Sequence, residues 1–331
     1  MLTIAIYSFQ PHCNKAFIEK MLCFIPSKIP RFRQIFALLG CLSAAWVSGC
    51  QSAMISASAT DDAAKDAMVA AIVRLDIVLF GEVHDNPAQH ALRAEIVGKA
   101  LDQGARPALA FEQFDRNVQA RIDAALASKP SSADAFLDTL FPGNTRPKGW
   151  QWRLYAPLIE FALKYDLPIV AANLSRADAT KVSMGGVDAV FDGPTQKMLG
   201  LDRTIAPNVS DEQRRAIKDG HCNALPDDGV TAMASAQLAR DAVLAESLRV
   251  NTSRGVILFA GNGHTRRDVG VGYWLGNELK ITSIGLLERA DAAINTTPPF
   301  DIVLTTEPHP REDPCIAFRA RREGSVVAPK P

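Results

Sequence analysis

Two motifs of the same form occur in the sequence, each a glycine followed three residues later by a histidine, and each directly after an apolar run. They are Gly81 with His84 and Gly261 with His264. A glycine lets the chain turn sharply off a strand, and a histidine three residues on can point into the crevice beside it. With a carboxylate from Glu82 or Glu112, two imidazoles could form a divalent-metal site or an acid–base pair.

Polar residues also follow two further apolar runs. Glu112 and Gln113 come directly after Phe111, and Asn173 comes directly after Ala172. A single glutamate or histidine in such a place is more often a loop cap or a charge at a helix start. Four run ends that carry such residues are harder to explain in that way, because open parallel sheets bind ligands beyond the carboxyl ends of their strands. The pattern therefore predicts a binding crevice at these ends.

A second group of candidate residues is aromatic. Trp150, Trp152 and Tyr155 stand together where a helix is expected to begin. Their rings offer a flat apolar surface for a planar ligand, and a tyrosine phenolate is a ligand of ferric iron. The alternative is that both tryptophans only pack the helix against the sheet.

Short apolar runs predict the strands that position these residues, in a sheet covered on both faces. The runs are residues 76–80, 107–111, 168–172, 256–260, 302–305 and, more weakly, 281–285. Helical periodicity lies between them, at 88–103, 116–127, 153–165, 211–219 and 231–250. This alternation predicts an α/β fold with a mostly parallel sheet flanked by helices.

The spacing of the predicted strands is uneven. Roughly 55 residues separate the second from the third, and more than about 80 separate the third from the fourth, which is far beyond one crossover helix. We expect these intervals to add a helical subdomain near 115–148 and 180–251, over one end of the sheet. The main domain is predicted at 67–310 and a polar tail at 311–331.

The composition is that of a globular protein and excludes several classes. Of 331 residues, 47% are hydrophobic and 22% charged, which argues against disorder and against a coiled coil. Lys and Arg number 36 and Asp and Glu also 36, with no dense basic run in the body of the chain. The electrostatic pattern that nucleic-acid binding needs is absent, so nucleic acid is not an expected partner.

The first fifty residues resemble a bacterial lipoprotein leader. Three basic residues precede an apolar stretch at 35–47, which is too short to span a bilayer, and the sequence VSGC ends at Cys50. We therefore predict a signal segment at 1–49, with Met1 or Met21 as the start, a lipidated Cys50 and a tether at 50–66. Gln51 favours the outer membrane. The alternative is an N-terminal anchor or a buried cysteine.

Two cysteines remain in the predicted folded body, Cys222 and Cys315. An oxidising envelope compartment would allow them to pair, but sequence spacing leaves open whether they meet. His221 beside Cys222 is a third candidate ligand pair. A histidine at a helix end next to a structural cysteine is an equally good explanation.

Several of these motifs, taken in order, resemble the ChaN-like haem-binding lipoproteins, which belong to a wider group with the Tiki proteases and the erythromycin-esterase-like proteins. The resemblance rests on LFGEVHDN at 79–86, FEQFD at 111–115, AANLSR at 171–176, the HC pair at 221–222 and GNGHTRRD at 261–268. It implies an α/β domain with a helical subdomain and a role in haem or iron acquisition at the bacterial envelope.

The resemblance also implies a ligand site. Haem would be bound non-covalently, because the chain has no c-type attachment sequence, and it can be held between two protomers. Tyr155 is the best match for the family's iron-ligating tyrosine. The other expected contacts are His84, His264, Trp150 and Arg266. An outer-membrane haem receptor and a second copy of the chain are the implied protein partners.

Two rival functions remain open. Tiki-like members use paired G-x-x-H motifs to bind a divalent metal for hydrolysis; here His84, His264 and Glu82 would hold the ion, and Glu82 or Glu112 would activate a bound water. In the other, the site is degenerate and the lipoprotein is a structural or partner-binding module.

Overall fold

The computed structural model describes residues 61–74, 77–289, 299–313 and 315–316. The predicted signal segment 1–49 and Cys50 lie outside these residues, as do most of the predicted tether at 50–66 and most of the tail at 311–331. Among the described helices, none is both long enough and apolar enough to cross a membrane.

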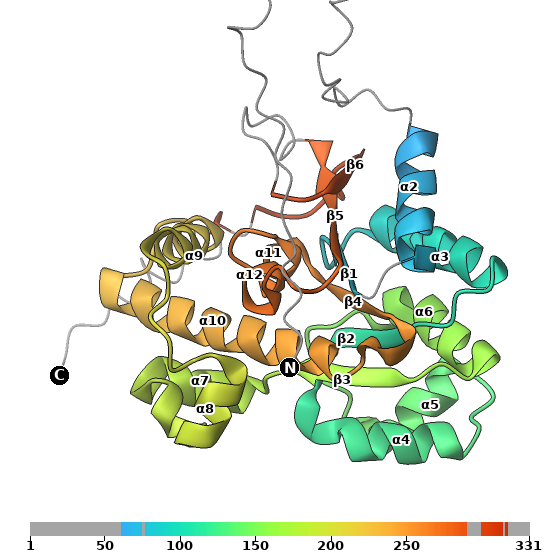
Figure 1. Cartoon of the computed structure of the whole chain (residues 1–331), viewed down its shortest axis with the longest axis horizontal. Helices are drawn as coiled ribbons and strands as arrows, with labels where there is room; N and C mark the ends of the chain where they lie inside the picture. Colours follow the sequence, from blue (N-terminus) through green and yellow to red (C-terminus); the bar gives the residue numbers. More distant parts are fainter. Residues whose placement is uncertain (1–60, 75–76, 290–298, 314, 317–331) are drawn as a thin grey trace, which may run out of the picture. The chain divides into compact units, whose positions relative to one another are not determined.

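Six parallel strands form the central sheet, in the order β3-β2-β4-β1-β5-β6 (Figure 1). Their bounds are β1 Ile77–Glu82, β2 Ala108–Asp115, β3 Ile169–Asn173, β4 Val256–Gly261, β5 Ile281–Glu288 and β6 Ile302–Thr306. Every predicted strand is present, the weaker one at 281–285 included. The predicted α/β class with a parallel sheet is confirmed.

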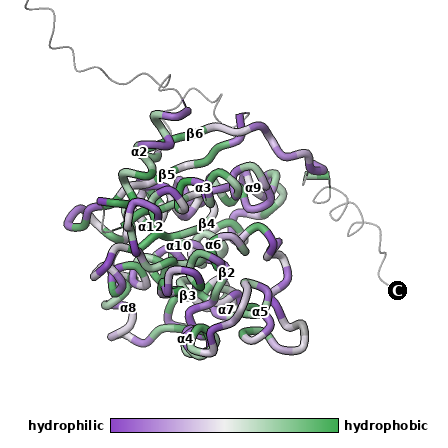
Figure 2. Tube along the Cα trace, turned by 90° about the vertical axis from the view of Figure 1, so that its right-hand side faces the viewer, coloured by the Kyte–Doolittle hydropathy of each residue, from purple (hydrophilic) through white to green (hydrophobic). Residues whose placement is uncertain are grey.

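The strands read as continuous apolar runs because both faces of the sheet are covered. Alternate residues of β1 belong to different cores: Val78 and Phe80 pack on one face, Ile77 and Leu79 on the other. Figure 2 shows β2 and β4 coloured mainly as hydrophobic. A sheet buried on both faces leaves only the strand ends for polar side chains, which is where the histidine motifs lie.

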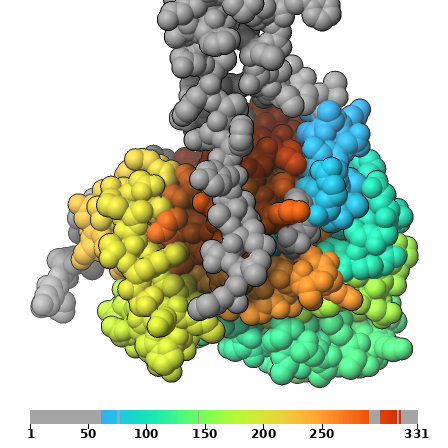
Figure 3. All heavy atoms as spheres, viewed as in Figure 1, coloured from blue at the N-terminus to red at the C-terminus, as the bar shows by residue number. Residues whose placement is uncertain are grey.

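The first core lies between the sheet and a layer of helices, which Figure 1 shows on one side of the strands. The layer consists of α2 (Asp61–Arg74), α3 (Pro87–Asp102), α4 (Gln119–Ala127), α5 (Ala133–Leu140) and α6 (Trp152–Tyr165). Helix α3 begins where Asn86 accepts hydrogen bonds from the backbone of Ala88 and Gln89. Helix α2 begins within the segment predicted as a tether and lies beside β6, the last strand of the sheet (Figure 3).

The second core lies on the opposite face of the sheet. Its helices are α7 (Arg176–Gly185), α8 (Gly193–Leu199), α10 (Asp227–Arg249) and α12 (Val271–Leu275); α9 (Pro207–Gly220) packs on α10, and the short α11 (Asn262–Thr265) follows β4. The helices inserted near 115–148 and 180–251 are therefore divided between the two faces.

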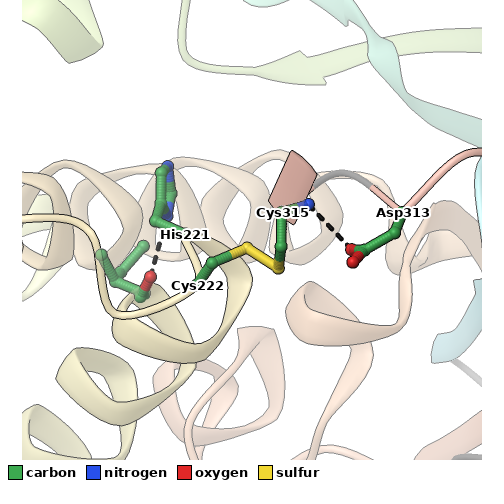
Figure 4. The surroundings of a disulfide bond; sticks show 5 residues. His221, Cys222, Asp313 and Cys315 are labelled. Carbon is green, nitrogen blue, oxygen red and sulfur yellow. Dashed lines mark hydrogen bonds between the residues drawn. A yellow bond between two sulfur atoms is a disulfide. The ribbon is translucent and has the colours of Figure 1, made fainter. Parts of the chain in front are cut away.

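A disulfide joins Cys222, just after α9, to Cys315 in the segment that follows β6, with 5.5 Å between the two Cα atoms (Figure 4). The pairing that the sequence left open is thus present. His221 is engaged as well, because its Nδ1 donates to the carbonyl of Ile217 at 2.8 Å. The His221–Cys222 pair is therefore a helix end and a crosslink.

Candidate ligand-binding site

A cavity of about 430 Å³ lies at the carboxyl ends of the strands, where the sequence predicted a crevice. Widely separated segments of the chain line it: the loop after β1, the end of β2, the loop before α6, the end of β3, helix α10 and the short α11. The side chains that matter most below are His84, Glu112, Gln113, Trp150, Arg240 and His264.

His84 is the more open of the two motif histidines, with 43% of its side chain exposed. Its Nδ1 lies 2.9 Å from Oε1 of Glu82, a buried residue at the end of β1. Its Nε2, on the other side of the ring, lies 3.9 Å from Oε2 of Glu112 in the cavity wall. One ring nitrogen is thus anchored, and the other is available to the cavity.

Electrostatics favour a proton on His84. Burial lowers the pKa of this imidazole, but the hydrogen bond to Glu82 and the charges of Glu112 and Glu82 outweigh burial and raise the pKa to about 9. Burial also raises the pKa of Glu82, yet its contacts with His84 and Arg93 leave that pKa lowered. At neutral pH the free protein therefore holds an imidazolium against a buried carboxylate.

The motif glycines make room for side chains. A β-carbon at Gly261 would lie 2.9 Å from Cε1 and Nε2 of His84, and one at Gly81 would collide with the side chains of Thr265 and Asn262. Gly81 lies inside β1, while Gly261 is the last residue of β4 and directly precedes α11; neither has a positive φ. The prediction that the glycine turns the chain off the strand is therefore wrong for Gly81. Because both glycines lack a β-carbon, they leave room for His84 and for α11 beside the sheet.

A buried polar network supports Glu82 from behind. The Arg93 guanidinium is fully buried, and its Nη1 lies 3.7 Å from Oε1 of Glu82. Its Nη2 donates to Nδ1 of His90 at 2.9 Å, and Nε2 of His90 donates to the carbonyl of His84 at 3.1 Å. Burial and the nearby Arg93 charge lower the pKa of His90 to about 4, so His90 is neutral and acts as a spacer.

Tyr155 belongs to the same network. It is fully buried, and its phenol donates to Oε1 of Glu82 at 3.3 Å. Burial and the charge of Glu82 raise its pKa further above the usual range, which disfavours a phenolate. Tyr155 thus lies behind His84 and outside the cavity lining, because the helix face that carries it is part of the core. Its predicted bond to haem iron stays a prediction.

His264 forms a second imidazole–carboxylate unit. Its Nδ1 lies 2.5 Å from Oδ1 of Asp241, and Nε2 of Gln213 donates to the other oxygen of Asp241 at 3.0 Å. Its Nε2 lies 3.5 Å from Oε1 of Glu112, while Oε2 of Glu112 accepts from the backbone of Gly261 at 2.8 Å. Burial lowers the pKa of His264, but the charges of Asp241 and Glu112 outweigh it and raise the pKa.

The arrangement does not suit the metal site of the rival reading. Glu82 contacts the Nδ1 side of His84, so it cannot share an ion with the Nε2 that faces the cavity. The carboxylate that both Nε2 atoms approach is Glu112, at 3.9 Å from His84 and 3.5 Å from His264. Among the described residues, no group of three or more His, Cys, Asp or Glu side chains has the geometry of a metal site.

The two remaining predicted residues differ in position. Trp150 lines the cavity and meets His84 edge to face, with 4.9 Å between ring centroids. Arg266 is elsewhere: it forms ion pairs with Glu212 and Asp268 and lines a separate depression beside α9. Arg266 is thus not part of the cavity lining, and its predicted contact with haem stays a prediction.

Sequence reasoning missed the supporting residues of both imidazoles. His90 and Arg93 lie one helical turn apart on the buried face of α3, and Asp241 lies on the buried face of α10. Charged side chains on the apolar face of a helix are rare unless paired. That mismatch is the signal that could have identified them.

A family model described as "Haem-binding uptake, Tiki superfamily, ChaN" matches residues 68–275. A structure titled for cofacial haem binding to ChaN of Campylobacter jejuni is 20% identical, covers 72% of this chain and 90% of its own, and superposes with a TM-score of 0.58. At this level of identity, the likeness is one of fold alone.

Two weaker structural likenesses were found. The type III effector HopBA1 is 14% identical over 74% of this chain and 94% of its own, with a TM-score of 0.42. A mutant erythromycin esterase, EreC, in its open conformation is 12% identical over 77% of this chain and 82% of its own, with a TM-score of 0.40. No curated protein matches the sequence.

Proposed function

Because the chain belongs to the ChaN family of haem-binding uptake proteins in the Tiki superfamily, we propose that it binds haem non-covalently in the cavity at the strand ends and serves haem or iron acquisition. The observation that carries this proposal is the half-exposed His84 imidazole, anchored through Nδ1 with its Nε2 available to the cavity.

The residues at the cavity fit the needs of a haem. A histidine imidazole is a common axial ligand of haem iron, and a carboxylate on its other nitrogen fixes the ring and strengthens it as a donor. Glu82 supplies that carboxylate to His84. Trp150 supplies an aromatic surface at the same wall. In this proposal Nε2 of His84 would coordinate the iron. Tyr155 acts indirectly, because its phenol donates to Glu82, which holds His84.

The proposal includes where the protein acts and with whom. The leader-like sequence that ends in VSGC at Cys50 supports a lipid-anchored protein of the bacterial envelope, with the outer membrane favoured. A cavity open to solvent leaves part of a bound haem uncovered. A second copy of the chain would cover it in a homodimer, and an outer-membrane haem receptor is the proposed source.

Replacing Cys50 by serine is expected to move the protein from the membrane fraction to the soluble fraction, because acyl chains supply nearly all the membrane affinity of such an anchored domain. Cell fractionation measures this, with a Cys41→Ser variant as the matched control, since Cys41 lies before the proposed cleavage point. A correctly processed Cys50→Ser protein that still pellets without aggregation would refute the anchor.

The affinity for haemin is expected to rise about tenfold per pH unit between about pH 6.5 and 8.5, and to level off above about pH 9. The cause is the His84 proton: with a pKa of about 9, Nε2 carries a proton below that pH, and iron must displace it. Titrations of haemin at several pH values measure the slope. Iron-free protoporphyrin is the control, because it has no iron to compete with the proton, and a flat haemin profile would argue against His84.

A further inference from the structure

Gln113 is a buried amide without a hydrogen-bond partner. It follows Glu112 on β2, is 2% exposed, and forms part of the cavity lining. Neither its Nε2 nor its Oε1 has a partner among the described residues. Buried amides are nearly always hydrogen-bonded, since an unpaired one loses its hydrogen bonds to water and forms none within the protein to replace them. The amide is therefore placed to receive a polar group of a ligand in the cavity.

The cavity rim is cationic. Lys148, Arg176 and Arg240 all line it, and within the described part of the chain none of them forms a salt bridge. Arg240 is held in place, because its Nη1 donates to Oδ1 of Asn173 and to the carbonyl of Leu174, both at 2.9 Å. The rim therefore combines one fixed guanidinium with two more exposed positive charges.

The cavity lining holds fewer carboxylates than the three cations, so it neutralises them only in part. Glu112 is engaged with the Gly261 amide and lies between the two histidines. Asp115 is the other acidic residue of the lining, and it interacts electrostatically with Arg240 and Arg176. Each cavity histidine already has its own buried carboxylate, Glu82 or Asp241. An excess of positive charge remains at the rim.

We propose that the cavity recognises its ligand through carboxylate groups, with Gln113 donating from Nε2 to a carboxylate oxygen and Lys148, Arg176 and Arg240 pairing with the charges. This rests on the proposed function and deepens it: the ligand class is a porphyrin dicarboxylate, recognised with or without iron. Charge-assisted hydrogen bonds of this kind are the strong ones in proteins.

The test separates the carboxylates from the iron by using iron-free ligands. Full-length protein, kept in one detergent, is titrated with protoporphyrin IX and with its dimethyl ester, and binding is followed by quenching of protein fluorescence, to which Trp150 in the cavity contributes. The diacid is expected to bind at least about tenfold more tightly than the ester. Added salt should weaken the binding of the diacid and leave the binding of the ester unchanged.

Variants assign the effect to the cavity. The pair Lys148→Ala with Arg176→Ala should weaken binding of the diacid about tenfold or more and leave binding of the ester unchanged. Gln113→Leu should also weaken binding of the diacid about tenfold, and binding of the ester by less, because the ester carbonyl is an uncharged acceptor. The control pair is Lys197→Ala with Arg254→Ala, which removes the same charge from exposed positions outside the lining. Thermal unfolding checks that each variant is folded.

The possible results are distinct. Equal binding of diacid and ester, or loss of affinity in the control pair alone, would overturn the carboxylate proposal. Binding of haemin without binding of the iron-free diacid would overturn it too, while leaving haem binding intact. Binding of the diacid without haemin would overturn the proposed function and keep the carboxylate site.

Discussion

Replacing Arg93 by methionine is expected to lower the free energy of unfolding by about 3 kcal/mol. The guanidinium is fully buried beside Glu82 and lies over the ring of Phe259, 5.1 Å from its centroid. Without Arg93, the buried Glu82 carboxylate keeps its negative charge but loses its nearest permanent cation. Because methionine fills most of the volume of the arginine side chain, the loss of unfolding free energy reports mainly the missing charge and only to a small extent the missing packing. Urea unfolding followed by circular dichroism gives the value.

Two further variants identify the cause of the Arg93 effect. Arg153→Met, on the exposed side of α6, should change the free energy of unfolding by less than about 0.5 kcal/mol. Combining Arg93→Met with Glu82→Gln should recover part of the loss, because the uncompensated carboxylate is then gone. A single Arg93→Met protein as stable as the unsubstituted one would contradict the account of Glu82 as a charge held by its neighbours.

Removing the disulfide, by replacing Cys222 and Cys315 together with serine, is expected to cost about 4 kcal/mol of unfolding free energy. The crosslink closes a loop of 93 residues, so it removes many conformations from the unfolded chain. It also ties the segment after β6 to the turn after α9.

The disulfide prediction carries its own control. A reductant should destabilise the unsubstituted protein by a similar amount and leave the double variant unaffected. Unfolding curves in urea, with and without the reductant, measure both effects. A reductant that leaves the unsubstituted protein's midpoint unchanged would contradict the stabilising role.

The strands could be predicted from the sequence because a sheet covered on both faces demands continuous apolar runs. β5 was the weakest of them because Thr282 and Ser283 interrupt the run; the structure shows that Ser283 is buried and donates to the carbonyl of Thr265. The strand order could not be predicted, since it depends on which crossover helices pack on which face. The order places β1 between β4 and β5, and so brings His84 and His264 together.

Several helices escaped prediction for physical reasons. α7 and α8 are short and carry few buried residues, so their apolar periodicity is weak, and packing against α10 stabilises them instead. α2 begins within the stretch 50–66, whose content of serine, alanine and threonine predicts a tether. Its buried residues Met68 and Ile72 dock on the first core, which a local pattern does not reveal.

The candidate site was predictable where residues follow strands and unpredictable where they lie on helices. The rule that parallel sheets bind ligands beyond the carboxyl ends of their strands predicts the places of His84, Glu112 and His264. Tyr155 was judged by its neighbours in sequence, but its spacing from Trp152 and Ile159 puts it on the buried stripe of α6. The partners of Glu82 and His264 depend on tertiary packing alone.

The central claim is that His84 holds haem in this cavity, and a haemin titration followed by Soret absorbance at about pH 8 tests it most directly. The full-length protein and a His309→Ala control are expected to saturate with the same affinity, because His309 lies outside the cavity lining. His84→Ala should bind about a hundredfold more weakly, with a changed spectrum. Unchanged affinity and spectrum in His84→Ala, or no saturable binding by the unsubstituted protein, would contradict the claim.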